Sequence, residues 1–251
     1  MAKDTKGGTG TAAGPTGGRN RRAVVAEMRE QQQRAERRKT LLIVGGALVA
    51  GVLLIAAVAV PAFISSRNDP AKKAVSALGV SASAASCDAP ITDPVSGSGV
   101  HVGPGTDKPN ETTVKYSTVP PTSGEHFAVP APFGKDFYTT ADVPKIEELV
   151  HNLEHGYTIL WYPRSADKAQ QDTIKALATK MAAMDETGRG KFIAAPWDPA
   201  YGAFPAGKSY ALSHWGQKQG YRQLCGQLSG SVVQDFVKAH PYTDSPEPQS
   251  A

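Results

Sequence analysis

Cysteine is scarce in this chain of 251 residues: there are two, Cys87 and Cys225. Without a Cys-x-x-Cys pair, the sequence lacks the thiol spacing of zinc-binding and thioredoxin-like motifs. It also lacks a phosphate-binding glycine loop between a strand and a helix, and the Gly-x-Ser-x-Gly turn that presents a nucleophilic serine. No internal repeat is present. These absences argue against nucleotide-binding, serine-nucleophile and dithiol chemistry.

Basic residues are lacking where a nucleic-acid-binding domain would need them. Residues 1–39 hold ten Lys or Arg against four Asp or Glu, and the remainder holds seventeen against nineteen. The first part therefore carries +6 and the rest −2, which gives the net charge of +4. Because a nucleic-acid-binding domain carries its basic face on the folded part, no nucleic-acid partner is expected.

Charge is absent from the apolar run between Leu41 and Ile64. About 20 apolar residues span a bilayer, so residues 40–65 are predicted to form a single transmembrane helix with the lipid bilayer as its partner. Basic residues 37–39 precede the run and a single Arg67 follows it. The positive-inside rule therefore places the N-terminus in the cytoplasm and the C-terminal part outside the cell membrane. The leading segment and the run are both too long for a cleaved signal peptide.

The rest of the chain is predicted to fall into segments by composition. Residues 1–39 are a basic cytoplasmic tail, disordered over about the first twenty positions and helical after them. The Ala/Ser-rich residues 66–86 are predicted to be a linker, 87–242 a single extracytoplasmic domain, and 243–251 a disordered tail. Both cysteines lie in the exported part, where an oxidising environment favours a Cys87–Cys225 disulfide. The alternative is that one cysteine is a copper ligand.

The exported domain is predicted to be α+β, with a mixed sheet and two or three helices. Strands are predicted at 100–102, 112–117, 158–162, 191–195 and 209–214. Helices are predicted at 166–184 and 231–240. The order strand, helix, strand between 158 and 195 predicts one right-handed crossover, and the other strands are expected to be antiparallel.

The most site-like stretch is a short helix that ends in a His/Glu cluster. His151 and His155 are four residues apart and lie on one face of a helix, with Glu154 beside them. Asp142 is the predicted N-cap and Gly156 the predicted C-terminal stop. The opposite face carries apolar residues that would pack on a sheet: Ile146, Leu149, Val150 and Leu153.

Several motifs together resemble a known family. They are Pro-Pro-Thr-Ser-Gly-x-His at 120–126, Val-His-Asn-Leu-Glu-His-Gly at 150–156, Trp-Tyr at 161–162 and Ala-x-x-x-Trp-Gly at 211–216. They are similar to those of actinobacterial membrane-anchored proteins that are known only as a domain of unknown function. The resemblance covers most of the exported domain, implies a single-span membrane protein and supplies no activity. Its motif residues are His126, His151, Glu154 and His155, and Glu125 departs from the proline expected there.

Three functions compete for this cluster. In the first, His126, His151 and His155 bind copper or zinc, with Glu154 as a ligand or supporting partner. In the second, the pattern His-x-x-Glu-His at 151–155 is that of a zinc hydrolase, which needs a further acidic residue downstream. Only two glutamates follow the motif, Glu186 and Glu247, and Gly156 cuts the helix short.

The third function is structural, and the sequence favours it. The His/Glu cluster would form a hydrogen-bonded network that holds the loop at 122–126 against the helix. The domain would then be an accessory or binding protein whose partner is another membrane or envelope protein, with no catalytic residue assigned. His101 and His240 are expected at the surface, and His214 is expected to be a hydrogen-bonded histidine at a strand end.

Overall fold

The computed structural model describes residues 17–184 and 190–250. These residues form two units that meet between Arg67 and Asn68, and each is described by itself. The disorder expected for residues 1–16 lies outside the described residues, and so does Glu186.

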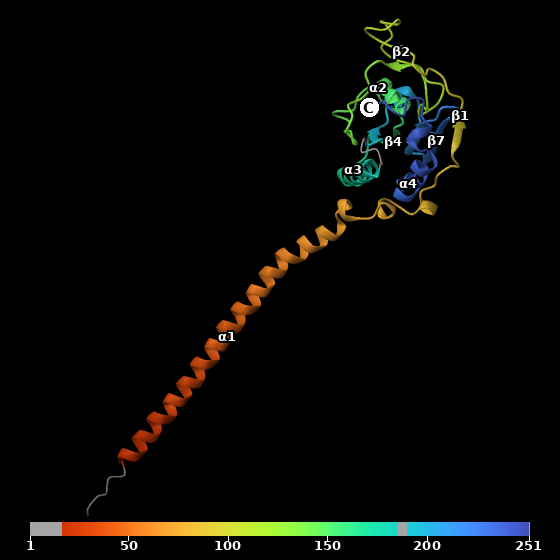
Figure 1. Cartoon of the computed structure of the whole chain (residues 1–251). Helices are drawn as coiled ribbons and strands as arrows, with labels where there is room; N and C mark the ends of the chain where they lie inside the picture. The colour runs from red at the N-terminus through yellow and green to blue at the C-terminus, as the bar shows by residue number, and fades with distance from the viewer. Residues whose placement is uncertain (1–16, 185–189, 251) are drawn as a thin grey trace, which may run out of the picture. The chain divides into compact units, whose positions relative to one another are not determined.

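The first unit is one uninterrupted helix, α1 (Gly17–Asn68), drawn in red to orange in Figure 1. It joins the predicted juxtamembrane helix and the predicted span, and it begins before residue 21, in the stretch expected to be disordered. Its Leu, Ile and Val side chains between residues 41 and 64 are exposed. Within the described part of the chain, this one helix is long and apolar enough to cross a membrane.

The second unit is α+β and is organised by a five-stranded sheet with the order β1-β7-β6-β4-β5. The strands are β1 (Ile91–Asp93), β4 (Thr158–Tyr162), β5 (Phe192–Pro196), β6 (Tyr210–Trp215) and β7 (Gly220–Cys225). Strands β4 and β5 are parallel and joined by helix α3 (Lys168–Ala183), as the strand–helix–strand pattern predicted. The other pairs in this sheet are antiparallel, so the sheet is mixed.

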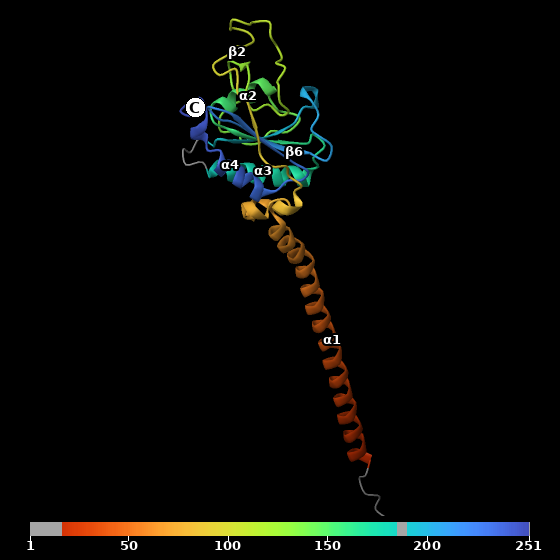
Figure 2. The same cartoon turned by 90° about the vertical axis from the view of Figure 1, so that its right-hand side faces the viewer.

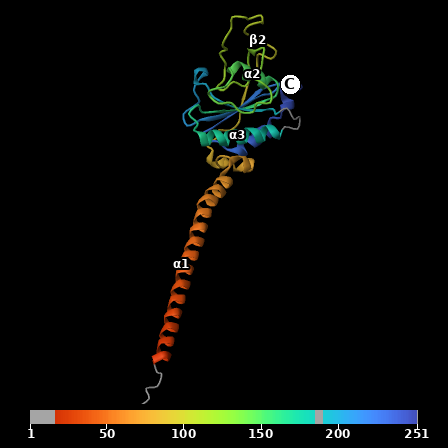
Figure 3. The same cartoon turned by 90° about the vertical axis from the view of Figure 1, so that its left-hand side faces the viewer.

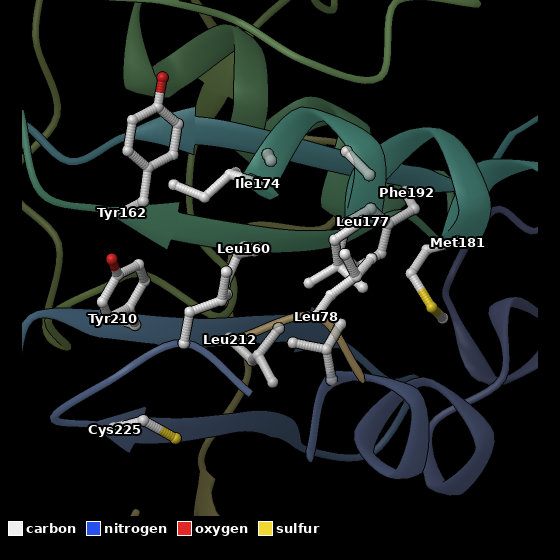
Figure 4. Close-up of a cluster of buried hydrophobic side chains, with 14 of the residues drawn as sticks. Leu78, Leu160, Tyr162, Ile174, Leu177, Met181, Phe192, Tyr210, Leu212 and Cys225 are labelled. Atoms are coloured by element: carbon white, nitrogen blue, oxygen red, sulfur yellow. The ribbon is translucent and has the colours of Figure 1, made fainter. Parts of the chain in front are cut away.

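Helices cover both faces of the sheet, α2 (Ile146–Glu154) on one and α3 with α4 (Gly230–Ala239) on the other (Figure 2, and from the opposite side Figure 3). Strand β4 is buried at every position because its side chains alternate between two cores. Leu160 and Tyr162 face the core beneath α3 and α4 (Figure 4), whereas Ile159 and Trp161 face the core beneath α2. Helix α2 therefore lies on the opposite face of the sheet from α3 and α4.

Helical spacing accounts for this packing. Ile174, Leu177, Ala178 and Met181 recur at helical spacing in α3 and are buried, whereas Met184 lies at the helix end and is exposed. The apolar face of α2 is buried as well. Its N-cap is Lys145, not Asp142, because the Asp142 carboxylate accepts hydrogen bonds from the backbone and hydroxyl of Thr139.

Two strand predictions need correction. Residues 112–117 alternate like a strand but pair with no other strand of the described chain. Instead the Val114 amide donates to the carboxylate of Glu147 on α2, at 2.8 Å. A second, parallel pair formed by β2 (His101–Val102) and β3 (His126–Phe127) was not expected, since β3 lies in a turn-rich loop.

The segment predicted to be a linker is folded against the domain. Its short 3₁₀ helices η1 (Pro70–Lys72), η2 (Val75–Ala77) and η3 (Ala82–Ala84) lead to β1, with η1 against α3 and η2 against α4. Leu78 is buried in the core beneath these two helices. The predicted disulfide is confirmed, because Cys87 is joined to Cys225 at the end of β7. Burial of apolar residues such as Leu78 therefore outweighs the flexibility that the composition favours.

The C-terminal segment expected to be disordered is also packed, over residues 243–250. Helix η5 (Tyr242–Asp244) is followed by Ser245, which is fully buried. The Glu247 amide donates to the carbonyl oxygen of Glu154 at 3.0 Å, and the Gln217 amide donates to that of Asp244 at 2.6 Å. Backbone hydrogen bonds thus fix this segment to the C-terminal end of α2 and to the turn between β6 and β7.

Gly156 is predicted to be essential for this docking. It ends α2 with φ +88°, and a Cβ atom there would lie 2.8 Å from Ser245 Oγ. Gly134 is a matched control because it has φ +78° and open space around the Cβ position. Gly134→Ala is expected to cost about 1 kcal/mol of unfolding free energy from conformation alone. Gly156→Ala should cost about 1–3 kcal/mol more from the clash. Equal losses for the two variants in urea unfolding would contradict the packing of the C-terminal segment.

His214 gives the second unit a predicted pH dependence. It is fully buried in β6, and its Nδ1 lies 3.1 Å from Thr158 Oγ1. Burial and the nearby charge of His240 lower the pKa of His214 to about 3. The unfolded chain therefore takes up this proton below about pH 6.5 while the folded chain does not.

As the pH is lowered from 6.5 to 3, His214 is consequently expected to reduce the free energy of unfolding by about 1.4 kcal/mol per pH unit. The measurement is urea unfolding at several pH values for the wild type and for His214→Gln. The difference in stability between the two proteins should shrink by about 2–3 kcal/mol from pH 7.5 to pH 4.5. A difference that does not change with pH would contradict the assignment.

Candidate functional site

Helix α2, strands β2 and β3 and the C-terminal segment of the second unit bring a cluster of histidines and glutamates together. Helix α2 supplies His151 and Glu154, and His155 is its C-cap. The short parallel strands β2 and β3 supply His101 and His126, which are paired in register. Two groups could each hold a metal ion, since one ligand atom from every member lies within 4.8 Å of the others. They are His101, His126, His151 and Glu154, here called the histidine group, and Glu154, His155 and Glu247, here called the glutamate group.

His126 and Glu154 form the centre of the histidine group. Both side chains are almost completely buried, and His126 Nε2 lies 3.0 Å from Glu154 Oε2. His126 Nδ1 lies 2.8 Å from the carbonyl oxygen of Gly124, and the Gly99 amide donates to Glu154 Oε1 at 2.7 Å. Neither His126 Nε2 nor Glu154 Oε2 has an aligned hydrogen-bond partner among the residues that the structure describes. These two atoms are close together, buried and not satisfied by the protein.

His151 is oriented in the same manner as His126. Its Nδ1 lies 2.6 Å from the carbonyl oxygen of Phe127, so this nitrogen carries the proton that it donates. Its Nε2 lies 3.1 Å from His155 Nε2, which confirms that the two histidines share one side of the helix end. The ring centroids of His126 and His151 are 4.7 Å apart, and the ring planes are tilted by 53° rather than stacked. The Nε2 atom of His126 thus faces Glu154, whereas that of His151 faces His155.

His101 completes the histidine group and was predicted to be a surface residue. Its ring lies 4.9 Å from that of His126 and 5.0 Å from that of His151. Its Nε2 is buried and has no hydrogen-bond partner in the described part of the chain. The sequence prediction missed it because a lone histidine between two valines carries no local signal of a site.

Electrostatics favours the ligand forms of these groups. Burial lowers the pKa of His151 to about 4, and the neighbouring charges of His126, His155 and His101 add to this effect. Burial alone would raise the pKa of Glu154. The contact with His126, the charge of that histidine and the hydrogen bond from the Gly99 amide outweigh burial and lower the pKa to about 2. Near pH 7, His151 is neutral and Glu154 is ionised. Both are the protonation states in which these residues bind metals.

Glu247 was placed in a disordered tail, yet it lies at the edge of the cluster. Its Oε2 is 3.4 Å from His155 Nε2, and its side chain is 46% exposed. It therefore supplies the downstream acidic residue that the His-x-x-Glu-His pattern requires. However, α2 ends at Glu154, and the Glu154 carboxylate is held by Gly99 and faces His126. A general base must be free to take a proton from water, so this geometry favours Glu154 as a ligand rather than as a base.

The other two histidines lie away from the cluster. His240 is only partly buried and stacks on Tyr221, with ring centroids 3.9 Å apart, and His214 lies near it at 6.2 Å. Neither belongs to a potential metal group of the described residues. His240 is therefore a suitable control position for experiments on the site.

Comparison with known proteins gives one match. The sequence model of a family described as "Protein of unknown function (DUF3105)" matches residues 107–251, which include every cluster residue except His101. No curated protein matches the chain. No solved structure matches it either.

Proposed function

The chain belongs to the DUF3105 family, and from its geometry we propose that its second unit binds a divalent transition metal, Zn²⁺ or Cu²⁺, through the histidine group. The single observation that carries the proposal is the contact between His126 Nε2 and Glu154 Oε2. His126 Nδ1 faces a carbonyl oxygen and must donate to it, so a neutral His126 has only a lone pair at Nε2. A lone pair and a carboxylate oxygen 3.0 Å apart need a cation that binds both.

Two kinds of cation meet this need. A proton on Nε2 would make a buried ion pair, for which Nε2 should be aligned on the carboxylate as a hydrogen-bond donor. Neither atom is aligned in this way. Two ligands of a tetrahedral zinc ion lie about 3.3 Å apart, since each is about 2.0–2.1 Å from the metal. The separation of 3.0 Å is compatible with either cation, and the lack of alignment supports a metal ion rather than a proton.

The outer contacts of the ligands support the same proposal. Metal-binding histidines usually donate their second ring N–H to a backbone carbonyl or a carboxylate, which fixes the tautomer and orients the ring. His126 and His151 make this contact with the carbonyl groups of Gly124 and Phe127. Glu154 is held in the same way through its other oxygen, by the Gly99 amide. Three ligands are thus preoriented by backbone groups of three different loops and strands.

The donor atoms limit the choice of metal. Calcium and magnesium prefer oxygen ligands, whereas imidazole nitrogen suits zinc and copper. Three histidines with one carboxylate therefore favour Zn²⁺ or Cu²⁺. The chemistry that such an ion supplies when bound is Lewis acidity or, for copper, electron transfer.

The same proposal places the metal-binding unit on the outer side of a cell membrane, anchored by α1. The uncharged run within α1 and the basic residues 37–39 that precede it support this orientation. The Cys87–Cys225 disulfide supports it too, because such bonds persist in oxidising compartments. Protease treatment of intact cells or spheroplasts should remove the second unit and leave α1 protected. Protection of the second unit would overturn this orientation.

The experiment that tests metal binding is elemental analysis of the full chain in detergent after dialysis against Zn²⁺ or Cu²⁺. The wild type is expected to retain a stoichiometric amount, and the double variant His126→Ala/His151→Ala to lose it. His101→Ala is a milder variant, because His101 is only partly buried and its Nε2 has no hydrogen-bond partner among described residues. It should bind more than about 100-fold more weakly, since losing a residue that only supports a ligand already costs 10–100-fold.

His240→Ala is the control and should bind as the wild type does. A wild type that retains neither metal would overturn the proposal. If the double variant of such a protein also unfolded at lower urea concentration, the cluster would be a structural network that holds the loop at 122–126 against α2. That is the function that the sequence favoured.

A further inference from the structure

The glutamate group lies next to the histidine group and is built by the C-terminal segment. The Glu247 amide donates to the carbonyl oxygen of Glu154, so Glu247 follows the end of α2 closely. Lys191 Nζ donates to the carbonyl oxygens of His155 and Ser250 and ties the helix end to the end of the segment. The backbone on both sides of Glu247 is thus held in place, and this places the Glu247 side chain beside His155. The backbone contacts do not involve the exposed carboxylate of Glu247.

The two groups share Glu154 and are connected through the histidine pair. Glu154, His155 and Glu247 each offer one ligand atom within 4.8 Å of the others. His155 Nε2 lies 3.4 Å from Glu247 Oε2 and 3.1 Å from His151 Nε2. A cation in the glutamate group would therefore be an immediate neighbour of one in the histidine group.

A simple ion pair between His155 and Glu247 is the alternative, and a half-exposed ion pair contributes little to stability. It does not include Glu154, which is a proposed ligand of the histidine group and also belongs to the glutamate group. The Glu154 side chain is almost completely buried, its Oε2 has no aligned partner in the described residues, and it belongs to both groups. Two carboxylates this close, one of them buried, repel each other unless a cation lies between them.

We propose that the glutamate group is a second metal subsite, so that the protein holds two divalent ions with Glu154 as their common ligand. This inference rests on the proposed function of the histidine group. Protein sites with two metals hold the ions about 3.5–4 Å apart and use shared carboxylates of helices for this purpose. The second subsite offers one nitrogen and two carboxylates and is open to solvent at Glu247. With three protein ligands it has room for water, as catalytic rather than structural zinc sites do.

The test counts Zn²⁺ ions per chain in full-length protein held in detergent, stripped with chelator and then dialysed against Zn²⁺. The variant is Glu247→Gln, which keeps the backbone amide that holds the segment on α2. The matched control is Glu111→Gln, since Glu111 has the same exposed fraction, 46%, and lies outside both groups. The wild type and Glu111→Gln are expected to hold two ions, and Glu247→Gln one.

Three other ion counts are possible, and each would overturn a different part of the proposal. One ion in the wild type and in Glu247→Gln would overturn the second subsite and leave the histidine group intact. Two ions in both would exclude Glu247 as a ligand and also overturn the inference. No ion in the wild type would overturn the proposed function itself, and the second subsite with it. Melting temperatures of the apo proteins, equal within error, establish that Glu247→Gln is folded.

Discussion

Removing metal from the purified full-length protein with a chelator is expected to lower its melting temperature by about 10 °C. A ligand that binds only the folded state adds about 4 kcal/mol of stability when its free concentration is 1,000 times its Kd. For a unit of 150–250 residues, 1 kcal/mol corresponds to about 2–4 °C. Differential scanning calorimetry in detergent, with and without chelator, measures the shift. Returning Zn²⁺ should restore the original value.

The double variant His126→Ala/His151→Ala separates this effect from other actions of the chelator. It should show a much smaller chelator shift than the wild type, because the histidine group has then lost two of its four ligands. His240→Ala should behave as the wild type, since His240 lies outside both groups. A chelator shift of equal size in the double variant would show that the ion binds elsewhere.

The second large effect is expected from the disulfide. Replacing Cys87 and Cys225 together by alanine should lower the free energy of unfolding by about 4 kcal/mol, because the bond closes a long loop with a sequence separation of 138. The loss acts mainly through the unfolded chain, since backbone contacts hold the same segments together in the folded state. The Asp88 amide donates to the Leu224 carbonyl, and the Gly226 amide to the Ala85 carbonyl, both at 2.9 Å.

Urea unfolding of the wild type and of the double alanine variant measures this loss. Metal content provides the control, because the Cys225 side chain belongs to the core beneath α3 and α4, whereas the cluster lies beside α2 on the other face of the sheet. The variant should therefore keep the metal stoichiometry of the wild type. A loss below about 1 kcal/mol would contradict the expected effect.

Local sequence patterns determined the elements whose contacts lie within a few residues along the chain. The uncharged run in α1 and the largely apolar β4 indicate their surroundings through composition, and the stripe of apolar residues in α3 does so through its helical spacing. The four-residue spacing of His151 and His155 likewise predicted that both rings lie on one side of the helix end, as they do. The two cysteines of the sequence left only one possible disulfide within the chain.

Tertiary packing decided the rest, because it joins positions that no short pattern connects. The stretch 112–117 alternates like a strand, yet a strand needs a neighbour, and the Val114 amide is satisfied by Glu147 instead. The segment 66–86 and the tail have the composition of flexible chain, but buried Leu78 and Ser245 fix them to the domain. His101 on the short strand β2 and Glu247 in the tail join the cluster from positions far before and after α2. Only the fold brings them to Glu154, since their positions depend on long-range hydrogen bonds and burial rather than on neighbouring residues.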